Sequence, residues 1–377
     1  MSTAEWTAAG WAQWAESTSY TVGAEEEVML LLPSDWTLAW EIDRVLPALS
    51  PGLIEHVTPE THSSALELRT TVHSTVDSLA AELRAVRRQL QDELRPMVLS
   101  AASAGTHPFT VWSESVVTTG ERQAAVYGSM RELARREPTF GLHVHVGIAD
   151  PEDAIRLSNA MRAHVPLLLA LSANSPFWQG RDSGLASART PLFQAFPRVG
   201  IPRAFRSYSD WVKAVGALID CGAFPEPTFL WWDVRPQPKF GTVEIRVMDA
   251  QTTVEETAAL VALVRCIARL EVEEGYAGDD LIEAVEALEE NRFIAARDGI
   301  RARLIDPEAM TRRAVPDVAN DLVAACTPHA EALGCLTELE RIRVMAETSG
   351  AERQLALARG EGRLTGLVAE LARRFTA

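Results

Sequence analysis

Residues 20–32 read YTVGAEEEVMLLL, an apolar stretch that carries three consecutive glutamates, Glu25, Glu26 and Glu27. The apolar residues around them predict a strand. Because successive side chains of a strand point to opposite faces, Glu25 and Glu27 project together and Glu26 projects the other way. Two carboxylates side by side repel each other unless a positive charge lies between them. The pair therefore predicts a site for Mg²⁺, which prefers oxygen ligands, or an acidic edge in solvent, or a pair neutralised by arginine.

Residues 140–148, FGLHVHVGI, alternate strictly and predict another strand. His143 and His145 share one face of it, and their apolar neighbours share the other. Two imidazoles two residues apart can share a ligand or bind a metal. The same pattern also suits two polar residues on the wet face of a half-buried sheet.

A Glu-x-Arg alternation occurs in two further strand-like segments. The sequence TVEIRV places Glu244 and Arg246 on one face, and ALELR does the same for Glu67 and Arg69. A carboxylate beside a guanidinium suits a phosphate site, with Glu at a metal and Arg at the developing charge. A cross-strand salt bridge is the alternative. Glu60 lies upstream in the turn-like segment TPETHSS.

These strands resemble one another, because each carries polar groups on one face and apolar groups on the other. If they form one antiparallel sheet, helices cover the apolar face and the polar face is a floor that suits two or more magnesium ions with nucleotide phosphates. The floor would carry Glu25, Glu27, Glu67, His143, His145, Glu244 and Arg246.

The remaining pattern predicts an α+β fold with a largely antiparallel sheet. We expect further strands at 53–57, 97–104 and 229–235, helices at 72–94 and 151–171, a long loop at 172–202, and helices from 253 onward. No shift in composition marks a boundary, so residues 1–377 are expected to form a single catalytic domain. Residues 1–19 form an N-terminal extension with Trp6, Trp11 and Trp14, for which we expect an amphipathic helix that docks on the body. Residues 253–377 form the mainly helical part of the same domain.

Composition excludes several classes of protein. The formal net charge of −16 argues against sequence-independent binding to nucleic acid or to an anionic membrane. The four cysteines match no zinc module, and the first twenty residues do not resemble a signal peptide. We therefore expect a cytoplasmic protein, and a homodimer on base rates. The chain has no GxxxxGK[ST] or GxGxxG motif, so phosphate is not held as in P-loop or Rossmann proteins.

Basic residues that could bind phosphate or a substrate carboxylate lie in the long loop and after it. They are Arg181, Arg189, Arg198, Arg203, Arg235 and Lys239. A surface charge is the alternative for each of them. The pair Trp231-Trp232 could form a wall for a nucleotide base or pack in the core.

The sequence resembles the YbdK-like carboxylate–amine ligases, also called type-2 glutamate–cysteine ligases. The matching motifs run in order from about residue 20 to 300: TVGAEEEVMLL, TPETHSSALELRT, GTHPF, GLHVHVG, LSANSPFWQGRDSGLASAR, FPRVGIP, LWWDVRPQPKFGTVEIRVMDAQTT and NRFIAARDG. The resemblance implies a fold like the glutamine synthetase/guanido kinase catalytic domain, with a curved, mostly antiparallel sheet backed by helices.

The resemblance also implies chemistry in which ATP phosphorylates a carboxylate and an amine attacks the acyl phosphate, with Mg²⁺ or Mn²⁺ at the phosphates. Small-molecule carboxylate and amine substrates, glutamate and an amine such as cysteine, are the expected partners. The implied metal ligands are Glu25, Glu27, Glu67, His143 and Glu244. We assign catalysis to Arg246, Glu27 and Arg235, nucleotide binding to Arg189, Arg198, Lys239 and Arg246, and substrate binding to His145, Glu60 and Arg203.

Two other functions remain open from the sequence. One is a phosphotransferase that phosphorylates a small carboxylate or guanidine without ligation. The other is a non-catalytic relative that binds nucleotide or an amino acid. The set of Glu and Arg side chains expected on the sheet argues against the second, because binding alone does not require so many carboxylates facing phosphate.

Overall fold

A computed structural model describes residues 10–136 and 138–377. Within these residues, seven strands form an antiparallel sheet in the order β10–β11–β5–β1–β3–β2, and β4 extends it by pairing with the end of β1 on the side opposite β3. The mostly antiparallel sheet predicted from the sequence is confirmed. The strands are β1 Val22–Leu31, β2 Val57–Pro59, β3 Ala65–Arg69, β4 Ser100–Ala102, β5 Gly141–Gly147, β10 Val234–Gln237 and β11 Thr242–Asp249.

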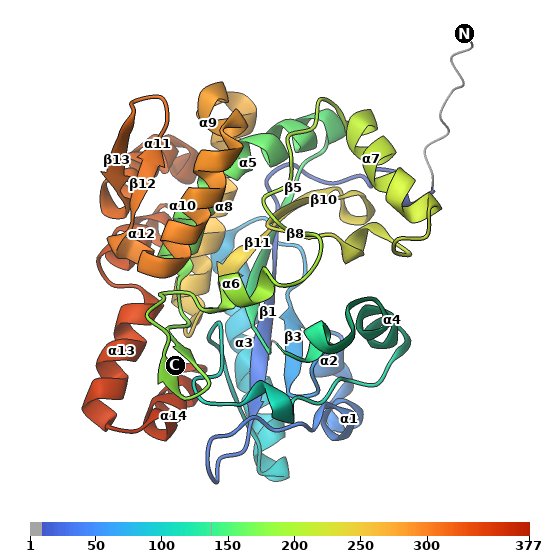
Figure 1. Ribbon diagram of the computed structural model, residues 1–377, viewed down its shortest axis with the longest axis vertical. Coiled ribbons are helices and arrows are strands. Elements are labelled where there is room, and N and C mark those ends of the chain that lie inside the picture. The colour runs from blue at the N-terminus through green and yellow to red at the C-terminus, as the bar shows by residue number, and fades with distance from the viewer. Residues whose placement is uncertain (1–9, 137) are drawn as a thin grey trace.

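Helices surround this sheet, and short strand pairs lie outside it (Figure 1). The helices are α1 Ile42–Val45, α2 Pro51–Ile54, α3 Val76–Leu94, α4 Glu121–Met130, α5 Pro151–Ser172, α6 Arg189–Phe193, α7 Tyr208–Asp220, α8 Val254–Glu273, α9 Asp279–Glu283, α10 Val285–Asp298, α11 Val315–Leu333, α12 Leu336–Glu347, α13 Gly350–Glu361 and α14 Leu364–Arg374. The outlying strand pairs are β6 Phe177–Trp178 with β7 Arg181–Asp182, β8 Val199–Gly200 with β9 Trp231–Trp232, and β12 Arg303–Asp306 with β13 Thr311–Ala314.

The three long helices that cover the sheet begin at capping residues that satisfy free backbone N–H groups. Helix α3 starts after Thr75, whose hydroxyl accepts a hydrogen bond from the Ser78 backbone N–H. Helix α5 starts after Asp150 with Pro151 in its first turn, as predicted. Helix α8 starts with a capping box at Thr253. These starts set the helices against the apolar face of β1, β5 and β11.

Glu26 is the exception on that apolar face, because it is a fully buried carboxylate. The Arg87 guanidinium of α3 approaches it at 2.8–2.9 Å through two nitrogens, and the Thr257 hydroxyl of α8 donates to it as well. Arg87 also donates to the backbone oxygens of Gln251 and Thr252. Glu26 therefore holds helices and sheet together and takes no part in the opposite face.

Figure 1 shows how the remaining helices are arranged around this core. Helices α9 to α12 lie at the upper left with the β12–β13 hairpin, α13 and α14 at the lower left, and α4 and α7 at the right. In the part of the chain that the structure describes, no helix is both long and apolar enough to cross a membrane.

Three predicted segments differ from the structure. Residues 53–57 are not one strand, because Pro51 starts the helical turn α2 and pairing begins only at Val57. Residues 229–235 divide into β9, which pairs in parallel with β8, and β10, which joins the main sheet. The helical last third contains the β12–β13 hairpin, which closes around a turn at Pro307.

The N-terminal extension packs on the body where the structure describes it. Trp11 packs edge-on against Trp211 of α7, and the Trp14 indole donates to the Ile148 backbone oxygen at 2.8 Å. From Gly10 onward the extension holds one short 3-10 helix and then irregular backbone, so the expected amphipathic helix is wrong there. Trp6 lies outside the described residues.

Candidate active site

The polar floor predicted from the sequence exists and spans β11, β5, β1 and β3. Glu25 on β1 lies directly opposite Arg69 on β3 and opposite His143 on β5. Glu27, two residues further along β1, lies opposite Glu67. Residues opposite each other on adjacent strands bring their side chains close together. The backbone register therefore gathers these groups before any side-chain interaction is considered.

A second row of polar residues continues the floor through β11. His145 lies opposite Glu244, which lies opposite Arg235 on β10. The pairing of β11 with β5 then shifts by one residue between Ile245 and Met248. Such a bulge re-aims side chains and often lies beside active sites. Here the bulge includes Arg246, whose side chain still projects from the floor into the cavity.

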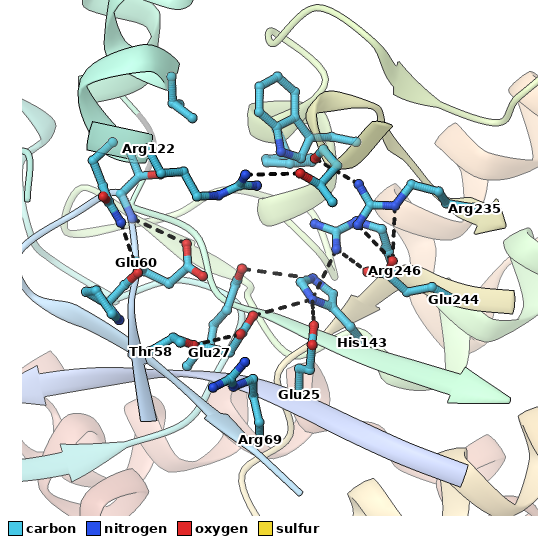
Figure 2. Close-up of a pocket in the computed structure, with 18 of the residues that line it drawn as sticks. Glu25, Glu27, Thr58, Glu60, Arg69, Arg122, His143, Arg235, Glu244 and Arg246 are labelled. Atoms are coloured by element: carbon cyan, nitrogen blue, oxygen red, sulfur yellow. Dashed lines mark hydrogen bonds and ion pairs between the residues drawn. The ribbon is translucent and has the colours of Figure 1, made fainter. Parts of the chain in front are cut away.

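A cavity of about 550 Å³ stands over this floor. Figure 2 shows Glu25, Glu27, His143, Glu244, Arg246 and Arg235 directed into it. The other walls come from α4 and the 3-10 helix Arg131–Arg135, from the β2 edge and from loops before β9 and after β10. They include Thr58, Glu60, Arg122, Val126, Met130, Ala134, Phe193, Phe196, Glu226, Trp231, Lys239 and Phe240.

Three carboxylates converge on the buried imidazole of His143. Glu25 Oε2 lies 3.4 Å from Nδ1, Glu67 Oε2 lies 3.9 Å from Nδ1, and Glu27 Oε1 lies 3.9 Å from Nε2. Dashed lines in Figure 2 mark the contacts of His143 with Glu25 and Glu27. Two sets of potential ligand atoms each fall within 4.8 Å of one another: Glu25, His143 and Glu244, and Glu27, Glu67 and His143.

Divalent cations fit this donor set. Oxygen donors suit Mg²⁺, and a mixed set with imidazole nitrogen suits Mn²⁺ as well. The Nε2 atoms of His143 and His145 are buried and have no hydrogen-bond partner among the described residues. Buried polar atoms normally find a hydrogen-bond partner, so these nitrogens are available to a ligand bound at the floor.

The acidic groups at the β2–β3 side of the cavity hold protons tightly. Burial, and then the negative charge of Glu27, raise the pKa of Glu60 to about 8. Burial, and then the charge of Glu25, raise the pKa of Glu67 well above its usual range. A cation bound among these carboxylates would supply the positive charge that favours their ionised forms.

The pKa values of Glu25 and of the two histidines on β5 shift in different directions. Burial by itself would raise the pKa of Glu25, but the adjoining imidazoles of His143 and His145 outweigh burial and lower it. Burial lowers the pKa of His143, and the charge of Arg246 adds to that effect. Burial would lower the pKa of His145, but the neighbouring carboxylates of Glu244 and Glu25 together outweigh burial and raise it.

Glu244 is held by a set of donors on β10 and β11. Arg235 donates to its Oε2 through Nε at 3.0 Å and through a terminal nitrogen at 2.8 Å, and Gln237 donates at 2.7 Å. Arg246 pairs with Oε1. These charges outweigh burial and hold the pKa of Glu244 well below its usual range. The other terminal nitrogen of Arg235 donates to two backbone carbonyls of the 228–230 turn. These bonds fix the Arg235 side chain, which in turn positions Glu244.

Known proteins that resemble this chain in sequence and in fold are ligases. Residues 21–371 match the family model described as glutamate-cysteine ligase family 2. The chain belongs to glutamate–cysteine ligase family 2. The resemblance stated from the motifs is thereby confirmed, and so is the predicted enzyme class, a carbon–nitrogen ligase.

Relatives of this glutamate–cysteine ligase family 2 chain cover nearly its whole length. A protein of Rubrobacter xylanophilus, named provisionally as glutamate–cysteine ligase 2-1, is 40% identical over 94% of this chain and 94% of its own. A protein of Sorangium cellulosum, named provisionally as glutamate–cysteine ligase 2, is 36% identical over 90% and 91%.

Solved structures share the fold at low identity. The glutamate–cysteine ligase of Francisella tularensis, solved in complex with AMP, gives a TM-score of 0.69 at 12% identity, over 96% of this chain and 89% of that one. The bifunctional glutathione synthetase of Pasteurella multocida gives 0.71 at 12% identity, over 94% and 52%. These likenesses support the predicted fold.

Three of the predicted loop arginines do not line the cavity of this family 2 chain. Arg189 is buried beside Gly141 at the start of β5 and donates to the backbone oxygens of Val247 and, at 3.3 Å, Arg246. Arg198 donates to a backbone oxygen before β9 and stacks on aromatic rings. Arg203 pairs with Asp210 at the surface. All three side chains thus bind to other parts of the protein and lie outside the cavity lining.

The other predicted residues do reach the cavity. Glu60 and His145 line it, and Lys239 lies at its wall with its ammonium over the ring of Phe240. Of the tryptophan pair, Trp231 lines the cavity, whereas its neighbour packs away from it.

Sequence reasoning did not assign a function to several cavity residues. Arg122 on α4 pairs with Glu226 at 2.6 Å and donates to Thr228. No motif surrounds Arg122, so the sequence carried no signal for it. Gln237 lies inside a matched motif between two assigned residues, and its position two residues after Arg235 on a strand could have revealed it.

Proposed function

We propose that the chain is an ATP-dependent carboxylate–amine ligase that forms an amide through an acyl phosphate. The observation that carries the proposal is the convergence of Glu25, Glu27 and Glu67 on His143, with the Arg246 guanidinium beside them. Phosphoryl transfer needs charge compensation and positioning far more than covalent chemistry. An acidic floor that can hold divalent cations, with an arginine at one side, provides both.

In the proposed reaction the substrate carboxylate attacks the γ-phosphorus of ATP, and ADP leaves. The amine then attacks the acyl carbon, phosphate leaves, and one proton is released. Divalent cations bound at the floor would neutralise the phosphate oxygens during transfer. Glu25, Glu27, Glu67, His143 and Glu244 would hold them.

Other residues of the cavity would stabilise charge, position one another and exclude water. Arg246 contacts His143 Nδ1 at 3.3 Å and pairs with Glu244, so its guanidinium lies where charge on a transferring phosphoryl group would develop. Arg235 positions Glu244 and thereby Arg246. Trp231 offers an aromatic wall for a flat group such as a nucleotide base. The apolar side chains of α4 close the cavity opposite the floor and limit water near an acyl phosphate.

The names of the relatives point to glutamate as the acid and cysteine as the amine. We propose glutamate with an amine such as cysteine as the substrate pair. Because ATP and free amino acids are its substrates, the proposal places the enzyme in the cytoplasm, and it requires neither nucleic acid nor a membrane as partner.

The experiment combines purified protein, Mg²⁺, ATP, glutamate and a pool of amines that includes cysteine. Phosphate release and the condensed product are followed together, the product by mass spectrometry. Release that requires both acid and amine, with a matching amide mass, supports the ligase. Release with acid alone, giving a stable phosphorylated product, would instead make the chain a phosphotransferase. Magnesium-dependent ATP binding without turnover on any acid would make it a nucleotide-binding relative.

A further inference from the structure

Arg69 is an arginine of the cavity that the reaction described above does not use. It is the last residue of β3 and lines the cavity floor at the edge away from Arg246. Its backbone is held on both sides, by pairing with Glu25 of β1 and by donation of its N–H to the His56 carbonyl at 2.8 Å. A side chain on such a rigid element has a well-defined origin.

The Arg69 guanidinium makes no hydrogen bond and no ion pair with any described residue, and its Nε is buried without a partner. The other arginines of the cavity differ in this respect. Arg235 and Arg246 pair with Glu244, and Arg122 pairs with Glu226. A guanidinium presents five N–H donors, and leaving buried donors unsatisfied is costly. Arg69 is therefore set to receive an acceptor from outside the chain.

The carboxylates closest to Arg69 in the sheet are turned away from it. Glu25, directly opposite, directs Oε2 to His143 and Oε1 to His145 at 3.4 and 3.7 Å, both on the far side of β1. Glu67 accepts from the Thr58 hydroxyl on β2 at 2.9 Å. Figure 2 draws no interaction to the labelled Arg69 side chain.

The position of Arg69 relative to Arg246 suggests what the acceptor is. Their strands, β3 and β11, are separated by β1 and β5. Three interstrand spacings place the two backbones about 14 Å apart. Both side chains extend into the same cavity, so the guanidinium groups lie at opposite ends of a space suited to a small molecule that is anionic at both ends.

We infer that Arg69 is a specificity-determining residue that binds the second carboxylate of a dicarboxylic acid substrate, the carboxylate that is not activated. This inference rests on the proposed function. A guanidinium recognises a carboxylate through two parallel N–H···O bonds, which adds geometric selectivity to charge. The same donors could instead bind a phosphate oxygen of the nucleotide, and the experiment separates these two anions.

The experiment measures binding by calorimetry, with Mg²⁺ and a non-hydrolysable ATP analogue present. Two acids are compared: glutamate, and 4-aminobutanoate, which keeps the γ-carboxylate and the amino group but lacks the α-carboxylate. Wild type is compared with Arg69→Gln, Arg69→Lys and Arg343→Gln. Arg343 lies on α12, pairs with Glu340 and does not line the cavity, so it controls for loss of one surface arginine.

We expect wild type to bind glutamate on the order of 10- to 100-fold more tightly than 4-aminobutanoate, the range for a charged hydrogen-bonded pair. Arg69→Gln should abolish most of this preference, Arg69→Lys should restore part of it, and Arg343→Gln should retain it. The affinity for the ATP analogue should change by less than about threefold in Arg69→Gln, because the proposed contact is to the acid alone.

Two results would overturn the inference. One is loss of affinity for the ATP analogue in Arg69→Gln with the preference between the acids intact, because Arg69 would then bind phosphate. The other is an Arg69→Gln variant that keeps both affinities. If instead wild type binds neither acid and catalyses no ligation with any acid, the proposed function itself fails, and the inference about Arg69 falls with it. Circular dichroism and thermal unfolding establish that each variant is folded.

Discussion

Glu25 on β1 and His143 on β5 lie directly opposite each other, with Glu25 Oε2 3.4 Å from His143 Nδ1. The other ring nitrogen of His143 faces Glu27, which lies two residues further along β1. One buried imidazole thus lies among carboxylates from β1 and from β3. This arrangement is the basis for the proposed cation site, and it predicts a different effect for each substitution at or near the site.

Replacing Glu25 with Gln removes one negative charge from the cation site and leaves its shape nearly unchanged. Cation affinity depends on the charge and number of the ligands, so we expect the affinity for Mg²⁺ to fall by at least about tenfold. Isothermal titration of the purified protein measures it. Glu55→Gln, at an exposed residue after α2, is the matched control and should bind as wild type does. Equal affinity in all three proteins would remove Glu25 from the cation site.

Replacing Arg246 with Ala removes the guanidinium beside His143 and Glu244. Groups that stabilise transition-state charge commonly contribute a hundredfold or more, so turnover should fall at least about a hundredfold. Arg246→Lys should recover only part of the loss, because an ammonium lacks the planar fork. Steady-state assays of ATP-dependent amide formation measure both variants, with circular dichroism as the check on folding. Near-wild-type turnover in Arg246→Ala would contradict the assignment.

Arg87 and Arg88 are neighbours on α3 in opposite environments, which makes them a matched pair for stability. Arg87 is buried against Glu26, and Arg88 is exposed. Removing one partner of a buried ion pair leaves an uncompensated charge, so Arg87→Ala should lower the free energy of unfolding by about 3–5 kcal/mol. Arg88→Ala should change it by no more than about 0.5 kcal/mol. Urea denaturation measures both, and similar effects in the two variants would refute the structural role of the Glu26–Arg87 pair.

Cation binding should release protons at neutral pH. The pKa of Glu60 is raised to about 8 by burial and by Glu27, and the pKa of Glu67 is raised by burial and by Glu25. Below these pKa values the carboxyl groups are protonated, and a cation displaces the protons, so Mg²⁺ affinity should rise with pH through neutrality. Titrations at pH 7 in buffers with different ionisation enthalpies count the protons released. A binding enthalpy that is the same in every buffer would show that no protons are released.

The sequence predicted the floor of the site better than its walls, and the physical reason is the range of the interactions. Alternation along a strand is local, so Glu25 and Glu27 could be placed on one face from the sequence alone. The same rule placed Glu26 on the apolar face, where a buried carboxylate needs a cation. The sequence did not identify Arg87 as that cation, although its helix was predicted, because helix-to-sheet packing is not local.

The loop arginines show that local sequence does not predict which distant groups a side chain contacts. Arg189, Arg198 and Arg203 were assigned to nucleotide or substrate because a long loop rich in arginine often binds ligands. Their actual partners are backbone oxygens and Asp210, which are fixed only when distant segments pack together. Arg122 reached the cavity for the same reason, because α4 is placed by tertiary contacts and no local pattern announces it.

The proposed ligation depends on activation of a substrate carboxylate as an acyl phosphate. The most direct measurement uses glutamate labelled with ¹⁸O in its carboxylates, together with ATP, Mg²⁺ and the amine found in the assay above. Mass spectrometry of the released phosphate then follows the label. Attack of the carboxylate on the γ-phosphorus predicts transfer of one ¹⁸O into phosphate for each amide formed. Amide formation with unlabelled phosphate, or with the label in AMP, would contradict the mechanism.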